Sequence, residues 1–367
     1  MNENVYASFE ANATMAGTYP LLRLFAVAEG GALSPQRDVP AFNRSDPSAS
    51  HWCSFNQAPV PNSKQVCNAW QVADEPTVIG AFSAACFYSA LELSRQLTGG
   101  RVLGLIHASV SSTPMELWAP PEALQKCAGQ PAAGPPDLSQ APRAIPPGNS
   151  TLFNAMIAPI SRFAIRGVWW DQGESNSGQP AAFFSCLFQA LIESWRRRWR
   201  IGDFAWVFAQ LGAQDSPSWP SYGVDVARGA QSGALPGAPA STTNTLGTAV
   251  AFDIGDMGSP YPPAHVHSRR KHELGRRLAL AMQHVQYALQ WPASRGAINL
   301  TAQATGGRPR PAPLPVPARA ARCASPWPRW TGWARRSTPP RTRGRAARAR
   351  GTWCRCPWRG AAAARAG

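Results

Sequence analysis

Five short apolar runs recur along the chain, and they constrain its fold more than any other feature. The runs are nearly continuous rather than alternating, and they are rich in branched and aromatic residues. Strands buried on both faces of a parallel sheet have this pattern, whereas strands with one wet face alternate. The runs cover residues 21–27, 102–108, 165–170, 204–211 and 249–254.

Helix-like segments lie between these runs. Residues 83–97 have apolar positions at helical spacing and end at Thr98-Gly99-Gly100, which is a helix stop. Residues 180–199 begin with Pro and end in a cluster of Arg, which suits the helix dipole, and residues 269–289 form a further periodic stretch. Strands that alternate with helices predict an α/β fold of three layers, with a doubly wound, mainly parallel sheet.

Three segments are expected to be surface loops. Residues 129–147 are rich in Pro, Gly and Ala, and residues 30–75 and 213–247 lack the periodicity of a helix or strand.

The apolar run from Phe163 to Trp170 ends abruptly in a polar stretch, residues 171–176. Folds of the α/β class place their sites at the carboxyl ends of parallel strands, so Gln172 and Glu174 are candidate site residues. Taken alone, the pattern also fits a strand that runs into an ordinary turn.

Several blocks of the sequence resemble the sialate O-acetylesterase family, a branch of the SGNH hydrolases. Residues 167–176 are similar to its Trp-Tyr-Gln-Gly-Glu-Ser-Asn signature, with Asp171 where Tyr is usual. Further blocks follow the family order at residues 82–86, 113–118, 152–159, 253–256 and 267–271. The resemblance covers roughly residues 10–300 and implies an SGNH, flavodoxin-like three-layer α/β/α fold.

The resemblance also implies ester hydrolysis with a Ser nucleophile, a His base, an acid that orients the His, and donors for the oxyanion. His267 stands where the family has the His of His-Pro-x-x-Lys, so we expect it to be the base. Without the resemblance, a surface His beside a helix start would be the better interpretation. His265 is the competing candidate, but only His267 has a Lys four residues later.

The other site residues are assigned by position. Asp256 is expected to orient the His, because the usual acid three residues before it is Ala264 here. Gln172 is expected to donate its amide to the oxyanion, and Glu174 to hold loops by accepting backbone N–H groups. Ser112 replaces a family Gly beside the oxyanion, and we expect it to crowd that approach unless its φ is ordinary.

The nucleophile itself is missing from this sequence. The family Ser lies in Gly-Gln-Ser-Asn-Met, some tens of residues before a Tyr-Pro-x-x-Arg-Leu-Phe block, which appears here at residues 19–25. Met1 stands about where the motif's Met would fall, so we expect the Ser and the first strand of the sheet to precede it. Removing an internal strand exposes buried faces and unpaired backbone groups, so the chain as written is expected to be poorly stable and inactive.

The net charge of +16 invites a nucleic-acid interpretation, but its distribution argues against one. Residues 308–367 contain 15 Arg and no Lys, Asp or Glu, which leaves 21 basic and 20 acidic residues in 1–307. The excess charge therefore belongs to the tail, and we expect no nucleic-acid partner. An RNA-binding role of the tail is the alternative that this distribution disfavours.

Two regions are expected, an esterase domain at 1–302 and a tail at 303–367. From residue 308 onward only ten residue types occur, which is typical of a GC-rich gene translated in the wrong frame. We interpret the tail as a gene-model artefact, with a functional Arg/Pro-rich tail as the alternative. In either case its composition predicts disorder.

Cysteines and glycosylation motifs bear on the compartment. Cys53 and Cys67 flank a polar loop and could form a disulfide, whereas Cys86, Cys127 and Cys186 are expected in the core or paired elsewhere. No close CxxC pair supports a metal or redox cofactor. No run reaches the roughly 18 apolar residues of a membrane span, and no signal peptide is present. A secreted or lysosomal protein is suggested by sequons at Asn12, Asn43, Asn149 and Asn299.

The function implied by the resemblance is a carbohydrate O-acetylesterase that removes O-acetyl groups from sugars without metal or cofactor. Sialic acid and acetylated plant or microbial polysaccharides are both open as substrates, and the oligomeric state is open too. The alternative is a catalytically inactive relative that binds acetylated glycan, as Ser111, Ser112, Ala264 and the missing Ser would favour.

Overall fold

The computed structural model describes residues 4–42, 53, 60–97, 99–132, 134, 145–213, 223–233, 245–261 and 267–287. Predictions about Ala264, His265, the sequons at Asn43 and Asn299 and the tail at 303–367 lie outside these residues. So does most of the loop predicted at 129–147.

The first three strands form a sheet of mixed direction, here called the β1 sheet. Its order is β2 (Trp70–Ala73), β1 (Tyr19–Ala26) and β3 (Leu103–His107). β1 runs antiparallel to β2 and parallel to β3, with Leu24 opposite Leu105. β2 falls in a predicted loop, and that prediction is wrong for these four residues, because an edge strand can be short and half polar.

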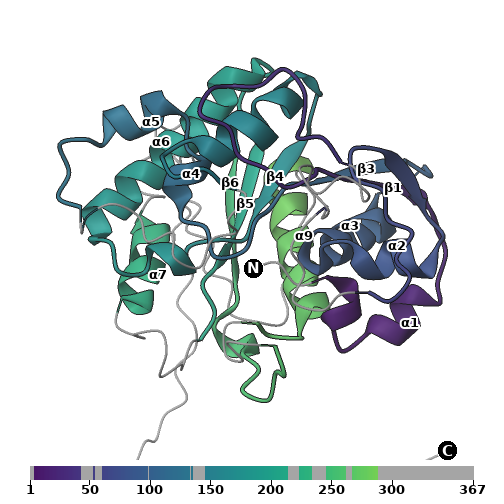
Figure 1. Ribbon diagram of the computed structural model, residues 1–367. Coiled ribbons are helices and arrows are strands. Elements are labelled where there is room, and N and C mark those ends of the chain that lie inside the picture. Colours follow the sequence, from purple (N-terminus) through teal and green to yellow (C-terminus); the bar gives the residue numbers. More distant parts are fainter. Residues whose placement is uncertain are drawn as a thin grey trace, which may run out of the picture. The chain divides into compact units, whose positions relative to one another are not determined.

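The other three strands form an entirely parallel sheet, here called the β5 sheet. Its order is β4 (Gly167–Trp170), β5 (Ala205–Gln210) and β6 (Leu246–Val250), as Figure 1 shows. The expected strand at 249–254 is displaced, because Phe252–Ile254 forms a 3-10 helix, η5. The α/β class with a parallel sheet is confirmed.

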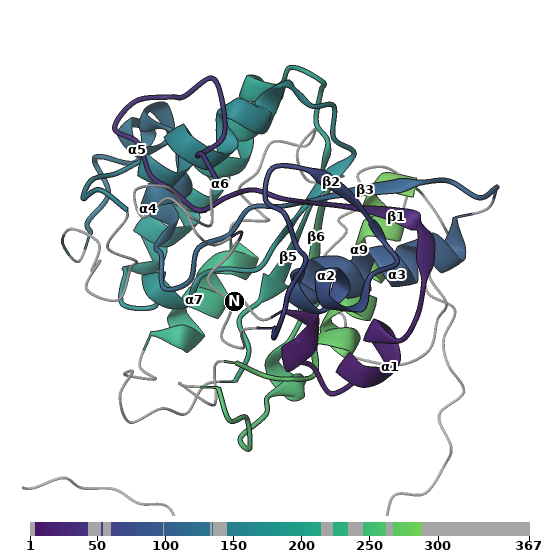
Figure 2. The ribbon, with the colours of Figure 1, turned by 45° about the vertical axis from the view of Figure 1, so that its right-hand side comes forward.

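Helices cover both faces of the sheets, which gives the predicted three layers (Figures 1 and 2). One helical layer contains α4 (Met115–Trp118), α5 (Pro121–Lys126), α6 (Ala181–Trp199) and α7 (Val224–Gly233). The opposite layer contains α2 (Pro76–Ala81), α3 (Ala84–Gln96) and α9 (Lys271–Tyr287), with α1 (Ala11–Met15) beside α2. Shorter helical turns are η1 (Val5–Ala7), η2 (Phe153–Ile157), η3 (Pro159–Arg162) and η4 (Glu174–Asn176).

The packing of β5 on both faces explains why residues 204–209 are continuously apolar. Trp206 and Phe208 pack with the aromatic residues of α6, whereas Ala205, Val207 and Ala209 pack against α9. Successive side chains of a strand point to opposite faces, so a strand covered on both faces has no polar position.

The three long helices agree with their predicted ranges. Ser83 caps α3, because its Oγ accepts a hydrogen bond from the Cys86 N–H at 3.4 Å. α6 begins after Pro180 and ends at Arg200, whose φ of 56° is left-handed. α7 falls in the loop predicted at 213–247, and that prediction is wrong for residues 224–233.

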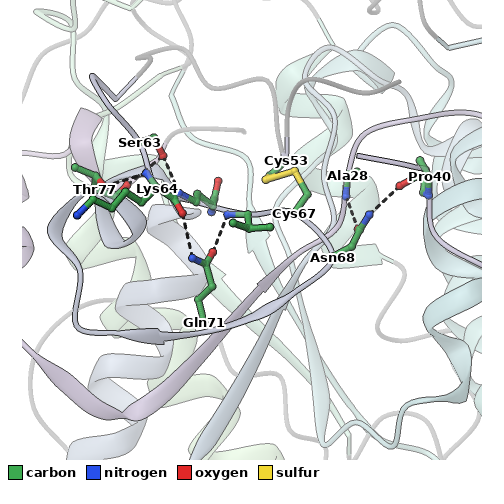
Figure 3. Close-up of a disulfide and its surroundings, with 11 residues drawn as sticks. Ala28, Pro40, Cys53, Ser63, Lys64, Cys67, Asn68, Gln71 and Thr77 are labelled. Carbon is green, nitrogen blue, oxygen red and sulfur yellow. Dashed lines mark hydrogen bonds between the residues drawn. A yellow bond between two sulfur atoms is a disulfide. The ribbon is translucent and has the colours of Figure 1, made fainter. Parts of the chain in front are cut away.

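Two disulfides join described cysteines. Cys53 and Cys67 are bonded, as the sequence suggested, and Figure 3 shows the bond beside Asn68. The Asn68 side chain accepts from the Ala28 N–H at 2.9 Å and donates to the Pro40 carbonyl at 2.8 Å, so it fixes this loop to the end of β1. Cys127 pairs with Cys186, which joins the end of α5 to α6, and Cys86 is free.

None of the helices in the described ranges is both long and apolar enough to cross a membrane.

Candidate active site

A cavity of about 510 Å³ separates β3 from β4 and is here called the interstrand cavity. Two unbroken runs of residues line it, 102–113 and 163–172, and these contain β3 and β4. Four of the five predicted site residues also line it: Ser112, Gln172, Glu174 and His267. The structure therefore brings together residues that are up to 155 positions apart in the sequence.

His267 lies just before α9 and is buried, with 6% of its surface exposed. The next residue, Ser268, replaces the Pro of the family pattern and secures the turn. Its hydroxyl donates to the Ile254 carbonyl at 2.7 Å and accepts from the Arg270 N–H at 3.2 Å. The turn that positions His267 is thus fixed to the segment after β6.

Asp256 is engaged by Arg269. Its Oδ2 accepts from the Arg269 backbone N–H at 3.2 Å and from Nε at 2.6 Å, and its Oδ1 accepts from a guanidinium nitrogen at 3.0 Å. These hydrogen bonds hold the pKa of Asp256 below its usual value. Asp256 does not line the interstrand cavity. Its contact with Arg269 is therefore better defined than its predicted role of orienting His267.

Gln172 is the most constrained of the candidates. Its Nε2 donates to the Thr113 carbonyl at 3.2 Å and to Asn176 Oδ1 at 2.8 Å, whereas its buried Oε1 accepts no hydrogen bond. The amide hydrogens are therefore already used within the protein. Donation to an oxyanion would require one of these two bonds to be replaced.

Asn176 links this network to the segment after β3, and sequence reasoning missed it. It is 2% exposed, accepts from the Met115 N–H at 2.8 Å and donates to Glu116 Oε2 at 2.7 Å. Burial raises the pKa of Glu116, and the bond from Asn176 opposes this rise. Asn176 ends the polar stretch that drew attention to Gln172, so its position after the strand was the available signal.

Glu174 is buried beside two charged residues. Burial raises its pKa, the Asp171 carboxylate raises it further, and Lys271 opposes the rise. Lys271 begins α9 and is only 2% exposed, so a buried cation and a buried carboxylate connect α9 to the loop after β4.

Ser112 has a left-handed backbone with a φ of 58°. Gly adopts such a φ without strain, whereas Ser does so rarely, which fits the Gly that the family pattern has here. The sequence predicts that Ser112 crowds the approach to the oxyanion unless its φ is ordinary, and a φ of 58° does not meet that condition.

A Ser–His pair at the end of β3 was not anticipated. Ser109 Oγ lies 2.6 Å from His107 Nε2, and both residues line the interstrand cavity. Burial lowers the pKa of His107 to about 4, so the ring is neutral at pH 7. His107 lies near the end of a predicted strand and Ser109 follows it, which is close to the signal that identified Gln172.

Comparison with known proteins gives consistent results. A family model described as carbohydrate esterase, sialic acid-specific acetylesterase matches residues 57–284. The sialate O-acetylesterases of mouse and human are 29% and 30% identical over 242 and 221 residues. Each alignment covers 54% of this chain, and it covers 44% of the mouse and 41% of the human protein.

A solved structure shares the fold. XAC1771, a carbohydrate acetylesterase from Xanthomonas citri, superposes with a TM-score of 0.56 at 23% identity, covering 79% of this chain and 54% of that one. The fold and the family model together define the class as carbohydrate esterases. Because the model matches more than half of the chain, the chain belongs to the sialic acid-specific acetylesterase family. It spans less than half of the length of the two curated relatives.

Proposed function

We propose that this chain provides the site of a carbohydrate O-acetylesterase that removes O-acetyl groups from sugars. The observation that carries the proposal is the convergence of His267, Gln172 and Ser112 on one cavity at the carboxyl ends of β3 and β4. Parallel sheets place catalytic groups at this edge, and family membership supports the ester-hydrolase chemistry.

In this proposal, His267 takes the proton of a Ser hydroxyl, which then attacks the acetyl carbonyl. The acyl-Ser intermediate forms as the sugar alkoxide leaves with that proton, and water attacks it to release acetate. The family's Gly-Gln-Ser-Asn-Met block does not occur in residues 1–367, so the proposal assigns the attacking Ser to no residue of this sequence. Asp256 supports the turn that carries His267, either by orienting the ring or through Arg269.

The test is acetate release from O-acetylated sialic acid and from acetylated polysaccharide by the protein purified from its natural source. We expect His267→Ala to lower kcat/KM at least about 10³-fold. His284→Ala is the matched control, because His284 is exposed on α9, the helix that follows His267, and does not line the cavity. Full activity of His267→Ala would refute the base assignment.

A second candidate is a relative that binds acetylated glycan without hydrolysing it. The engaged amide of Gln172 favours this alternative, since both of its bonds lie within the protein. Saturable binding of O-acetylated sialic acid by the same protein, together with no acetate release, would favour it over the esterase.

A further inference from the structure

Ser109 and His107 have the geometry of a nucleophile and its base. Ser109 Oγ lies 2.6 Å from His107 Nε2, within the range over which a His nitrogen activates a Ser hydroxyl. Both residues line the interstrand cavity, and Ser109 is half-buried, so a molecule in the cavity can reach its hydroxyl. The proposed sugar esterase uses His267, and it leaves this pair without a role.

Packing holds the His107 ring in place. His107 ends β3, and its carbonyl accepts from the Val27 N–H at 2.9 Å. The ring centroid is 5.5 Å from that of Phe82, which meets it edge-on and is fully buried. Phe82 immediately precedes Ser83, the cap of α3, so the ring is held between β3 and the start of that helix. A base that its own surroundings hold in place needs little rearrangement when the hydroxyl reacts.

The charge of the His107 ring determines which esters suit the pair. Burial lowers the pKa of His107 to about 4, so the ring is neutral at pH 7 and can accept a proton. When Ser109 Oγ donates to Nε2, the ring proton is on Nδ1, which has no hydrogen-bond partner among the described residues. A Ser–His–acid triad has its acid at that nitrogen. Without the acid, the buried imidazolium loses its proton readily, so the pair suits acyl donors whose leaving group is a weak base.

Apolar side chains form the walls beside the pair. Leu105 precedes His107 by two residues in β3, so the two side chains share one face of the strand. Trp169 of β4 packs against the cluster that contains Leu278 and Met282 of α9, and all three line the cavity. A cavity of about 510 Å³ with such walls accepts a small apolar acyl or aryl group.

The indole of Trp169 supplies a hydrogen-bond donor in the same cavity. Its Nε1 is buried and has no partner among the residues that the structure describes. Nearly all buried polar groups in folded proteins are hydrogen-bonded, so this N–H marks a place for an acceptor from a bound molecule. An ester carbonyl oxygen is such an acceptor, and it binds a donor more strongly as it gains negative charge during attack.

We propose that Ser109 and His107 form a second acyl-transfer site, whose substrates are aryl esters of small apolar acids. Ser109 Oγ bonds to the acyl carbon, the bond from that carbon to the aryl oxygen breaks, and His107 passes the Ser proton to the departing oxygen. Water then attacks the acyl carbon, the bond to Oγ breaks, and His107 returns a proton to Oγ as the carboxylic acid leaves. The inference does not rest on the proposed function, because it uses neither His267 nor a sugar ester.

The first measurement follows release of 4-nitrophenolate from 4-nitrophenyl acetate. We expect the rate to fall at least about tenfold in Ser109→Ala and in His107→Gln, because each variant removes one member of the pair. Ser175→Ala and His272→Gln are the matched controls and should keep the parent rate. Ser175 lines the same cavity, whereas the His272 ring lies 3.1 Å from a Glu92 oxygen. Equal rates in the parent and all of these variants would overturn the proposal.

A second measurement locates the reacting atom and does not depend on the folding of any variant. Diisopropyl fluorophosphate forms a stable Oγ–P bond with an activated Ser, while its P–F bond breaks and HF leaves. Peptide mass spectrometry of the parent chain should find this adduct on Ser109, and an unmodified Ser109 would overturn the proposal. Because neither reagent is a sugar ester, failure of the chain to deacetylate sugars would leave this inference standing.

Discussion

The β1 sheet and the β5 sheet differ in the fraction of their residues that are buried. β5 has five fully buried residues out of six, whereas β1 has four out of eight and its neighbour β2 has one out of four. The β5 sheet packs a group of aromatic rings against α6, with Trp206 5.3 Å from Trp195 and 5.5 Å from Trp170. The difference indicates that the β5 sheet carries the larger share of the core, while the β1 sheet packs a smaller core against α2 and α3 and has a disulfide beside it.

The largest effect should come from truncating the core of the β5 sheet. Trp206 is fully buried, so Trp206→Ala should lower the free energy of unfolding by about 3–5 kcal/mol. Trp70 lies on the β1 sheet and is 45% exposed, so Trp70→Ala should cost about 1–2 kcal/mol. Urea unfolding of both variants measures the difference. Equal losses would contradict the unequal burial of the two sheets.

Removal of each of the two disulfides provides a second comparison, between the losses of stability that result. Cys127 and Cys186 are 59 positions apart, and removing both with Ala should cost about 4 kcal/mol through the entropy of the unfolded chain. Cys53 and Cys67 are 14 positions apart, and their removal should cost about 3 kcal/mol. Cys86→Ala, which removes the free thiol, controls for loss of sulfur. A larger loss for the shorter loop would show that the β1 sheet needs its disulfide more than loop length predicts.

Two titratable groups at the facing edges of the two sheets should change the stability of the protein in opposite directions as the pH falls. Burial lowers the pKa of His107 on β3 from 6.5 to about 4, so between these values the unfolded chain binds a proton that the native state does not. His107 should therefore cost about 3 kcal/mol of stability as the pH falls from 6.5 to 4. Burial raises the pKa of Glu174 after β4, so Glu174 should add stability as the pH falls through its native pKa toward 4.5.

Urea unfolding across this pH range measures both effects. His107→Gln should remove the loss on acidification, and Glu174→Gln should remove the gain. A His107→Gln protein that loses as much stability as the parent between pH 6.5 and 4 would show that His107 is not buried in its neutral form.

The smallest expected effect concerns the packing of α3 against α9. A Cβ at Gly275 would lie 2.4 Å from the Tyr88 Cβ and 2.8 Å from the Ser89 nitrogen, so Gly275→Ala should cost about 1–3 kcal/mol. Gly229 in α7 has nothing within 4 Å, and Gly229→Ala should stabilise the protein by up to about 1 kcal/mol. Thermal unfolding of the two variants checks the contrast. A neutral Gly275→Ala would mean that the two helices can separate freely.

Much of the fold was predictable because its signals are local. The continuous apolar runs located β1, β3, β4 and β5, and the cap at Ser83 and the stop near Arg200 bounded two helices. β2 and α7 were missed because their stability comes from neighbours in space. β2 gains its hydrogen bonds only beside β1, and α7 packs its small residues, such as Ala227, against α6.

The candidate site was predictable in part for the same reason. Gln172, Glu174 and His267 were identified from strand ends and family blocks, and the structure places them on one cavity. The preference of Asp256 for Arg269 was not predictable, because it depends on where a neighbouring guanidinium points. The division of the strands into two sheets, with the cavity between β3 and β4, was not predictable either, because it depends on which strands pair in space.

The contacts of α9 have a mechanical consequence. This helix packs along α3 on one side and against β5 and β6 on the other, and His267 precedes its first turn. Helix α9 therefore links α3 to the β5 sheet. The hydrogen bond from Gln172 to the Thr113 carbonyl joins the segment after β4 to the segment after β3. Any rotation of one sheet about α9 would change the width of the interstrand cavity and move β3 relative to His267. The width of the cavity and the alignment of the groups that line it would then change together, so a mutation in α9 could alter both without contacting the cavity.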